Sequence, residues 1–177
     1  MGLHYENLDG ETRRYMLHEY EGDLTAGKLF LSSRLTDPGK EKYKILLKQA
    51  IEYHDDDWLE DQLNREGCFK EKEERNVKGK IIVADVPETA AVTLAEGEFN
   101  RFYIRGLCQR ALKSSISRLI IYRAKPVSNP RPESQARIGA QIEAAPLLQD
   151  LREKPGIEPA LGLPPGPNSG LSVKLPQ

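Results

Sequence analysis

His54, Asp55, Asp56 and Asp57 form the one run in the chain with obvious metal-ligand chemistry. Their carboxylate oxygens suit Mg²⁺ or Ca²⁺ better than Zn²⁺. Consecutive residues of a helix diverge by about 100° around its axis, so adjacent side chains rarely converge on one ion. Asp55 as the N-cap residue of a helix, with two acids in the first turn, explains the run without a metal. We therefore expect no metal ion and no cofactor.

Two further positions carry groups that take part in catalysis in other proteins. Cys108 falls on the apolar face of a predicted helix, which favours an inert buried thiol over a nucleophile. Cys68 and Cys108 belong to no C-x-x-C pair, so we expect reduced thiols, although a disulfide between them stays open. Tyr122 and Arg123 end a predicted strand, where α/β active sites occur, but no second catalytic group accompanies them. We assign no catalytic residue.

The stretch EGEFNRFYIRGLCQRALKSS, residues 96–115, places aromatic and cationic side chains on one predicted helix, 94–114. One broad face carries the apolar residues that form the expected core side. The opposite side mixes cations with Phe99, Phe102 and Gly106. Aromatic and arginine side chains dominate the energetics of protein interfaces, and a mid-helix glycine permits close approach of another backbone. We interpret Phe99, Phe102, Arg105 and Gly106 as a docking patch; the alternative is a helix packed between two layers of its own domain.

A basic segment with interleaved aromatic residues suggests nucleic acid as a second type of partner. From Phe99 to Pro132 the chain has eight basic residues and no acid. The net charge of −1 and the pI of about 6.3 argue against a dedicated nucleic-acid binder, because residues 1–79 carry 18 acids against 13 bases. The residues expected to contact nucleic acid in this alternative are Arg101, Arg105, Arg110, Lys113, Arg123 and Arg131.

The C-terminal segment 155–177 is rich in proline and glycine and ends in an alternating strand pattern. Leu171, Val173 and Leu175 alternate with polar residues, as in a single strand that lacks a sheet of its own. We expect an extended arm that adds this strand to a partner, and we expect the rest of the chain to fold without it. Whether the arm binds in cis or in trans cannot be decided from the pattern.

The remaining elements predict an α+β fold. Helical periodicity and caps predict helices over 10–26, 37–54 and 55–67, the last two forming a hairpin. Short strands are expected at 28–32, 80–86 and 118–124, and a charged connector, 68–79, is expected to be mobile. The strand, helix and strand over 80–124 suggest a βαβ crossover within one small sheet. A T-x-x-E capping box, Thr93 to Glu96, would open the central helix.

This pattern divides the chain into one domain, 1–154, and the arm, 155–177. Within the domain we expect a helical part (1–67), the connector (68–79) and a βαβ core (80–154) that includes one or two short helices after residue 134. No apolar run approaches the roughly 20 residues that a membrane span requires, and the N-terminus has no secretory pattern. We therefore expect a cytoplasmic protein without membrane contact.

The segments EGEFNRFYIRGLCQRAL, YRAKPVSNPRPES and LPPGPNSGLSVKLP resemble uncharacterised proteins of bacteria and their phages. The resemblance spans most of the chain and implies a phage or prophage origin, with a virion as an alternative location. It implies no activity, and no functional residue is carried over from it.

The function that these patterns favour is non-enzymatic: a protein–protein interaction or assembly protein, with a phage structural component as one form. Docking would use the patch on helix 94–114 and the C-terminal arm, and the partner would be another protein or a second copy. A nucleic-acid-binding regulator is the alternative, and a small enzyme with an unrecognised site is the third.

Overall fold

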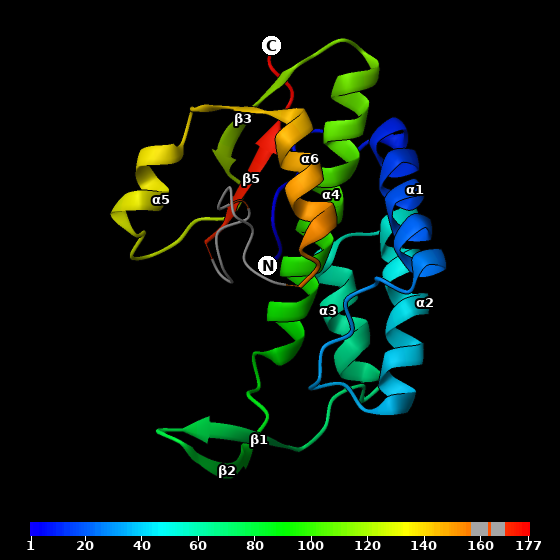
Figure 1. The fold of residues 1–177 in the computed structure, drawn as a ribbon, viewed down its shortest axis with the longest axis vertical. Coiled ribbons are helices and arrows are strands. Elements are labelled where there is room, and N and C mark those ends of the chain that lie inside the picture. Colours follow the sequence, from blue (N-terminus) through cyan, green and yellow to red (C-terminus); the bar gives the residue numbers. More distant parts are fainter. Residues whose placement is uncertain (157–162, 164–168) are drawn as a thin grey trace.

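The computed structural model describes residues 1–156, 163 and 169–177, and it has an α+β fold (Figure 1). Its described helices are α1 (Gly10–Ala26), α2 (Asp37–Tyr53), α3 (Asp56–Arg65), α4 (Ala90–Lys113), α5 (Pro132–Arg137) and α6 (Ala144–Glu153). Its described strands are β1 (Lys72–Val77), β2 (Lys80–Asp85), β3 (Arg118–Arg123), β4 (Gln141–Glu143) and β5 (Leu171–Lys174). All strand pairs are antiparallel.

Helix α4 is the centre of the fold, because α1, α3, α6 and β5 all pack against it (Figure 1). It starts at Ala90, one turn before the predicted capping box. The N-cap residue Thr89 makes no side-chain cap bond, and Glu96 forms an ion pair with Lys125 instead of a capping contact. The predicted capping box is therefore wrong: packing on several sides stabilises the first turn, so the helix needs no box there.

The N-terminal helices follow their local capping signals. Asp9 accepts a hydrogen bond from the Thr12 amide and starts α1 as predicted, and Gly27 ends it with a left-handed backbone at φ 66°. Thr36 caps α2, and Asp55 caps α3 as predicted. The buried side chains of these helices join those of α4 in one core that includes Met16, Tyr20, Tyr43, Leu47, Ile51, Leu59 and Leu63.

The larger sheet has the strand order β4-β3-β5. Ile121 pairs with Val173 and Leu119 pairs with Ile142, which fixes the register on both sides of β3. The N-terminal segment lies against the end of this sheet, where the His4 amide donates to the Ala124 carbonyl at 2.8 Å. The predicted strand over 171–175 is thus real, and it pairs with β3 of its own chain.

The two-stranded sheet is a separate hairpin of β1 and β2 that stands away from the helices (Figure 1). The connector predicted at 68–79 is not irregular throughout, because six of its residues form β1 and pair with β2; its mobility stays a prediction. The predicted βαβ crossover is wrong: β2 and β3 form on either side of α4 as expected, but they lie in different sheets. A tight turn connects β1 directly to β2, so β2 pairs with the strand next to it in the sequence and not with β3. Residues 28–32, predicted as a strand, have no strand structure.

None of the helices in the described part of the chain combines the length and the apolar character needed to cross a membrane.

Candidate functional site

The predicted docking patch on α4 lies inside the protein. Phe99 is fully buried and its ring is 5.2 Å from that of Tyr5, while Phe102 is 3% exposed and packs edge-on against Tyr20. A Cβ atom at Gly106 would lie 2.6 Å from Met16 Cγ, so α1 occupies the close approach that this glycine permits. The helical wheel identified a second packing face correctly, but the neighbour on that face is α1 of the same chain. The patch is therefore not available as a surface in this structure.

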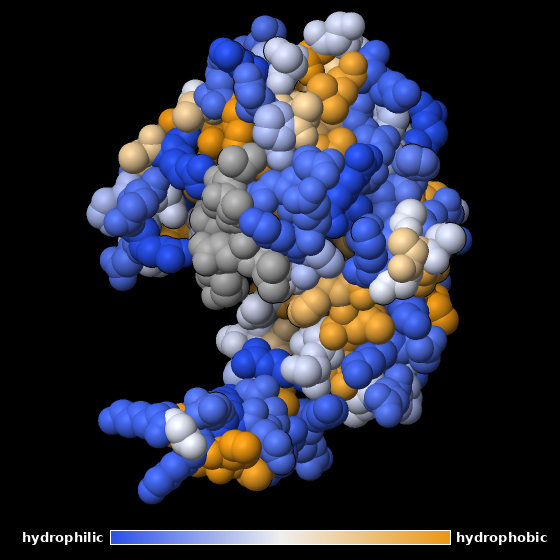
Figure 2. Space-filling view, in the orientation of Figure 1, coloured by the Kyte–Doolittle hydropathy of each residue, from blue (hydrophilic) through white to orange (hydrophobic). Residues whose placement is uncertain are grey.

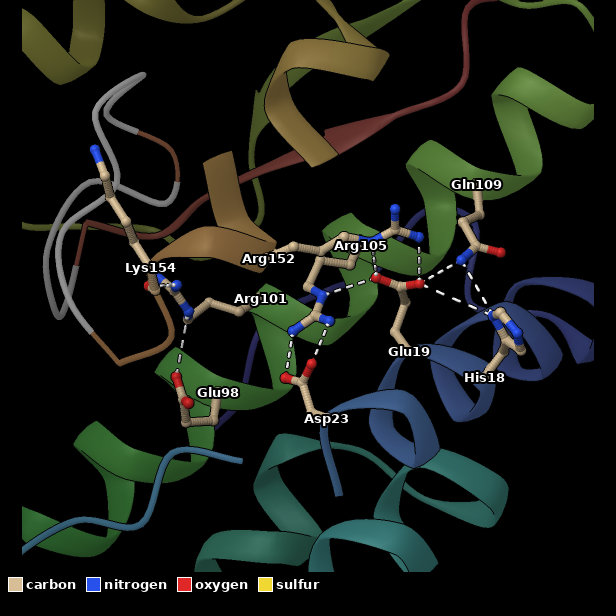
Figure 3. A network of polar contacts seen from close by, with 9 residues as sticks. All are labelled: His18, Glu19, Asp23, Glu98, Arg101, Arg105, Gln109, Arg152 and Lys154. Atoms are coloured by element: carbon tan, nitrogen blue, oxygen red, sulfur yellow. Dashed lines mark hydrogen bonds and ion pairs between the residues drawn. The ribbon is translucent and has the colours of Figure 1, made fainter. Parts of the chain in front are cut away.

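Arg105 belongs to a buried network of charges between α1, α4 and α6 (Figure 3). Its Nε donates to Glu19 Oε1 at 3.0 Å, and its two terminal nitrogens donate to the Asp23 carboxylate at 2.7 and 2.9 Å. Arg152 of α6 donates to both oxygens of Glu19, at 2.8 and 2.7 Å. Gln109 also donates to Glu19. The network joins three helices and leaves these groups paired with one another.

The titration behaviour of this network fits a structural role. Burial alone would raise the pKa of Glu19, but the hydrogen bond from Arg152 and the charge of Arg105 lower it overall. Glu98, one turn before Arg101 and two turns before Arg105, behaves differently: burial raises its pKa to about 7, and the two arginines offset this only in part. Arg101 lies 3.5 Å from Glu98 and donates to the Lys154 carbonyl (Figure 3).

The other cations predicted to contact nucleic acid do not form one basic surface. Arg110 pairs with Asp9 at 2.7 Å and with Glu11 at 3.2 Å. Arg123 donates to the Ser169 carbonyl at 2.9 Å and to Gln135. Lys113 and Arg131 are exposed on separate segments, at the end of α4 and before α5. Acids of α1 and of its N-cap thus pair with Arg105 and Arg110 of the basic segment within the same molecule.

The residues predicted for the C-terminal arm are also internal. Leu171 and Val173 are fully buried, and Leu175 is half-buried with its amide donating to Asn7 at 2.9 Å. Asn100 of α4 donates to the Leu171 carbonyl and accepts from the Ser172 hydroxyl, which fixes the strand on the helix. This part of the arm completes the core, and its apolar side chains are covered within the chain.

The groups considered for chemistry have structural partners. Asp55 caps α3, the Leu3 amide donates to Asp56 at 3.0 Å, and His54 stacks on Trp58. Within the described ranges, no group of three or more His, Cys, Asp or Glu side chains converges to hold a metal ion. Both cysteines are buried as free thiols, and burial raises the pKa of Cys108. Tyr122 donates to the His4 carbonyl at 2.6 Å, and burial raises its pKa to about 12.

The β1–β2 hairpin exposes several apolar side chains close together. Ile81 is 71% exposed and Val83 is 68% exposed on one face, and Val77 and Ile82 are exposed on the other. Figure 2 shows apolar surface on the hairpin, bordered by hydrophilic residues. At its base, Glu73 accepts from Arg34 at 2.8 Å, which ties the hairpin to the loop between α1 and α2.

The turn explains how this charged segment becomes a strand. Lys78 and Gly79 both have left-handed backbones, with φ of 51° and 81°, as a two-residue type I′ turn requires. The Gly79 amide donates to the Asn76 side chain at 3.0 Å and stabilises the turn. The stretch N-V-K-G-K, residues 76–80, directly before the apolar strand is the sequence signal for this hairpin turn. The many charged residues in 70–75 favour a solvated connector instead, so the strand before the turn was not predicted.

No protein-family model, no curated protein and no solved structure matches this chain. The predicted phage or prophage origin stays a prediction, and the candidate function is argued from the chain's own residues.

Proposed function

We propose that this protein is a protein–protein interaction or assembly protein that docks through the β1–β2 hairpin, residues 72–85. The observation that carries the proposal is the exposure of Ile81 and Val83 on a two-stranded sheet that projects from the body. The partner-binding role that the sequence suggested for α4 and the C-terminal strand passes to the hairpin, because those two elements are occupied within the chain.

The energetics of the hairpin support this role. A two-stranded hairpin alone is marginally stable in water, and a third strand or a covering layer is normally required. Full burial of one Ile or Val side chain contributes on the order of 1.5–3 kcal/mol, so covering the hairpin would recover a sizeable free energy. Its contribution to the folding of the body is small, because its apolar side chains lie outside the core. The hairpin therefore has the properties of a contact element.

The hairpin also has a free edge for strand addition. Neither β1 nor β2 pairs with any other strand in the described structure, so each presents unpaired backbone groups along its outer side. Strand addition uses such groups for affinity and alternate side chains for specificity. The apolar side chains on both faces would provide those specific contacts.

In-cell photocross-linking tests the proposal. A photoreactive amino acid replaces Val83 in one variant and Ile45 in the control. Ile45 is equally apolar and 63% exposed, but it lies on α2 away from the hairpin. We expect discrete protein adducts from position 83 and none of the same mass from position 45. Identical adducts from both positions, or none from position 83, would contradict the proposal.

A further inference from the structure

We infer that the partner of the hairpin is a second copy of this chain, joined edge to edge through β2 into a four-stranded antiparallel sheet. This inference rests on the proposed docking role of the hairpin and adds the identity of the partner and the register of the contact. It follows from the hydrogen-bond alternation of β2, from the positions of its apolar residues and from the charges at the two ends of the hairpin.

The alternation of hydrogen-bonded and non-hydrogen-bonded pairs between β1 and β2 determines which backbone groups of β2 are free to bond to a second copy. The Val86 amide donates to the Glu71 carbonyl at 2.9 Å, and this pair continues the register in which Arg75 lies opposite Ile82. Hydrogen-bonded and non-hydrogen-bonded pairs alternate in antiparallel sheets, so the backbone groups of Ile82 face β1. The backbone groups of Ile81 and Val83 therefore face away from β1, along the free edge.

Two-fold symmetry restricts the register of self-pairing. An axis perpendicular to the sheet keeps each side chain on its own face, so one residue must lie opposite itself in the second copy. With Ile82 on the axis, Ile81 of each copy lies opposite Val83 of the other, and their outward groups form hydrogen bonds. Side chains of directly opposed residues contact each other. Ile81 and Val83 of both copies would then form a four-residue apolar cluster on one face.

The other face gains a smaller apolar contact in the same register. Ile82, which is 43% exposed, would meet Ile82 of the second copy at a non-hydrogen-bonded position, where side chains approach most closely. The register with Val83 on the axis is less favourable, because it places Ile81 opposite Asp85.

The charges of the hairpin are complementary under this symmetry. The turn carries Lys78 and Lys80, neither of which has an ion-pair partner within the described structure, whereas the base carries the acids Asp85, Glu71 and Glu88 together with Lys70 and Lys72, and Lys72 pairs with Asp85. Antiparallel pairing places the turn of each copy beside the base of the other, so the two lysines would flank Asp85 of the second copy. The strands are six residues long, or roughly 20 Å, which keeps the two bodies at opposite ends of the sheet.

Sedimentation of the purified full chain tests whether the second copy binds. Contacts between two short strands are small, so we expect association to depend on concentration, from the 20.0 kDa monomer at about 10 μM to twice that mass at about 500 μM. Ile81→Lys should abolish the larger species, whereas Ile45→Thr on α2 should leave it unchanged. A monomer at every concentration would overturn the self-pairing. Adducts from position 83 to a different protein would, in that case, still support the docking role.

A cysteine scan tests the register. A cysteine at position 82 would face its own copy on the axis, at a Cα separation of about 4.5 Å that a disulfide can span. Cysteines at position 81 or 83 alone would lie more than about 7 Å from their equivalents, too far for a disulfide. We therefore expect Ile82→Cys to cross-link with itself, and Ile81→Cys to cross-link only when mixed with Val83→Cys. Cross-linking that is equal at all three positions, or strongest at 81 or 83 alone, would overturn the edge-to-edge register.

Discussion

At the scale of single residues, Asp56 has the least satisfied environment among the described carboxylates. It is 1% exposed, its Oδ2 accepts from the Leu3 amide, and its Oδ1 has no hydrogen-bond partner. Burial raises the pKa of Asp56 to about 7; the hydrogen bond from the Leu3 amide offsets this only in part, and the charges of Glu96 and Asp55 add to the rise. Ionisation of Asp56 therefore lowers the stability of the folded state, although the same carboxylate binds the Leu3 amide and so holds the N-terminal segment in place.

Asp56→Asn should remove this cost in a pH-dependent way. Because the pKa of Asp56 is about 7 in the folded state and 3.8 ordinarily, the folded state binds the proton more tightly, and the cost of ionising this buried carboxyl appears as pH rises from about 4 to 7. The variant should gain stability relative to the parent by about 2–4 kcal/mol across that window. Urea unfolding at several pH values measures it, with the exposed Asp57→Asn as the control. A difference that does not change with pH would contradict the assignment.

Arg105 illustrates the opposite case, a buried charge with full pairing. Arg105→Met would leave Asp23 without its two charged hydrogen bonds and weaken those to Glu19. Removal of one partner from a buried ion pair costs about 3–5 kcal/mol, so we expect a loss of that size in urea unfolding. Arg118→Met is the matched control, because its side chain is 58% exposed and lies 3.9 Å from Glu143. The Arg118→Met variant should lose less than about 1 kcal/mol in its free energy of unfolding. Equal losses in the two variants would contradict the structural role of the network.

At the scale of elements, the two glycines of α4 test how closely α1 and α4 pack. Gly97 has open space where a Cβ would lie, whereas a Cβ at Gly106 would lie 2.8 Å from the Met16 backbone nitrogen. Gly97→Ala should stabilise the protein by about 0.5–1 kcal/mol through helix propensity. Gly106→Ala should destabilise it despite the same gain, because backbone atoms of α1 would have to move. Thermal melting compares the two, and a stabilising Gly106→Ala would contradict this packing.

The elements that the sequence predicted well are those with local signals. Asp9 and Gly27 mark both ends of α1, and the alternation of Leu171 and Val173 marks β5. The hairpin was missed because the charges of β1 suggest a solvated connector, and only its turn reveals the strand pairing. For Phe99 and Phe102 the structure supports the alternative interpretation, a helix packed within its own domain, because a helical wheel shows that two faces are apolar but not which neighbour covers the second.

At the scale of the whole molecule, the C-terminal strand is part of the fold. A chain that ends before Ser169 would lose the fully buried Leu171 and Val173 and one of the two neighbours of β3. We expect it to lose more than about 4 kcal/mol, a large fraction of the stability of a typical domain. This replaces the sequence-based expectation that the chain folds without its arm. Near-ultraviolet circular dichroism measures it, with removal of the exposed Pro176 and Gln177 as the control. A native spectrum from the shorter chain would contradict the role of β5.

The residues that stabilise the fold and the residues proposed to bind a partner lie in different parts of the molecule. The buried network, the α4 packing and β5 hold the body together, and the exposed apolar residues of the hairpin lie outside that core. Substitutions at Ile81 should therefore change association and leave the free energy of unfolding within about 0.5 kcal/mol of the parent.

The most direct test of this account is the yield of in-cell cross-linked adducts from position 83, compared with and without Ile81→Lys in the same chain. The account predicts that adducts form in the parent and are lost when the lysine is present, while the protein stays folded. Adducts of unchanged yield and mass in the presence of the lysine would show that the hairpin is not the docking element.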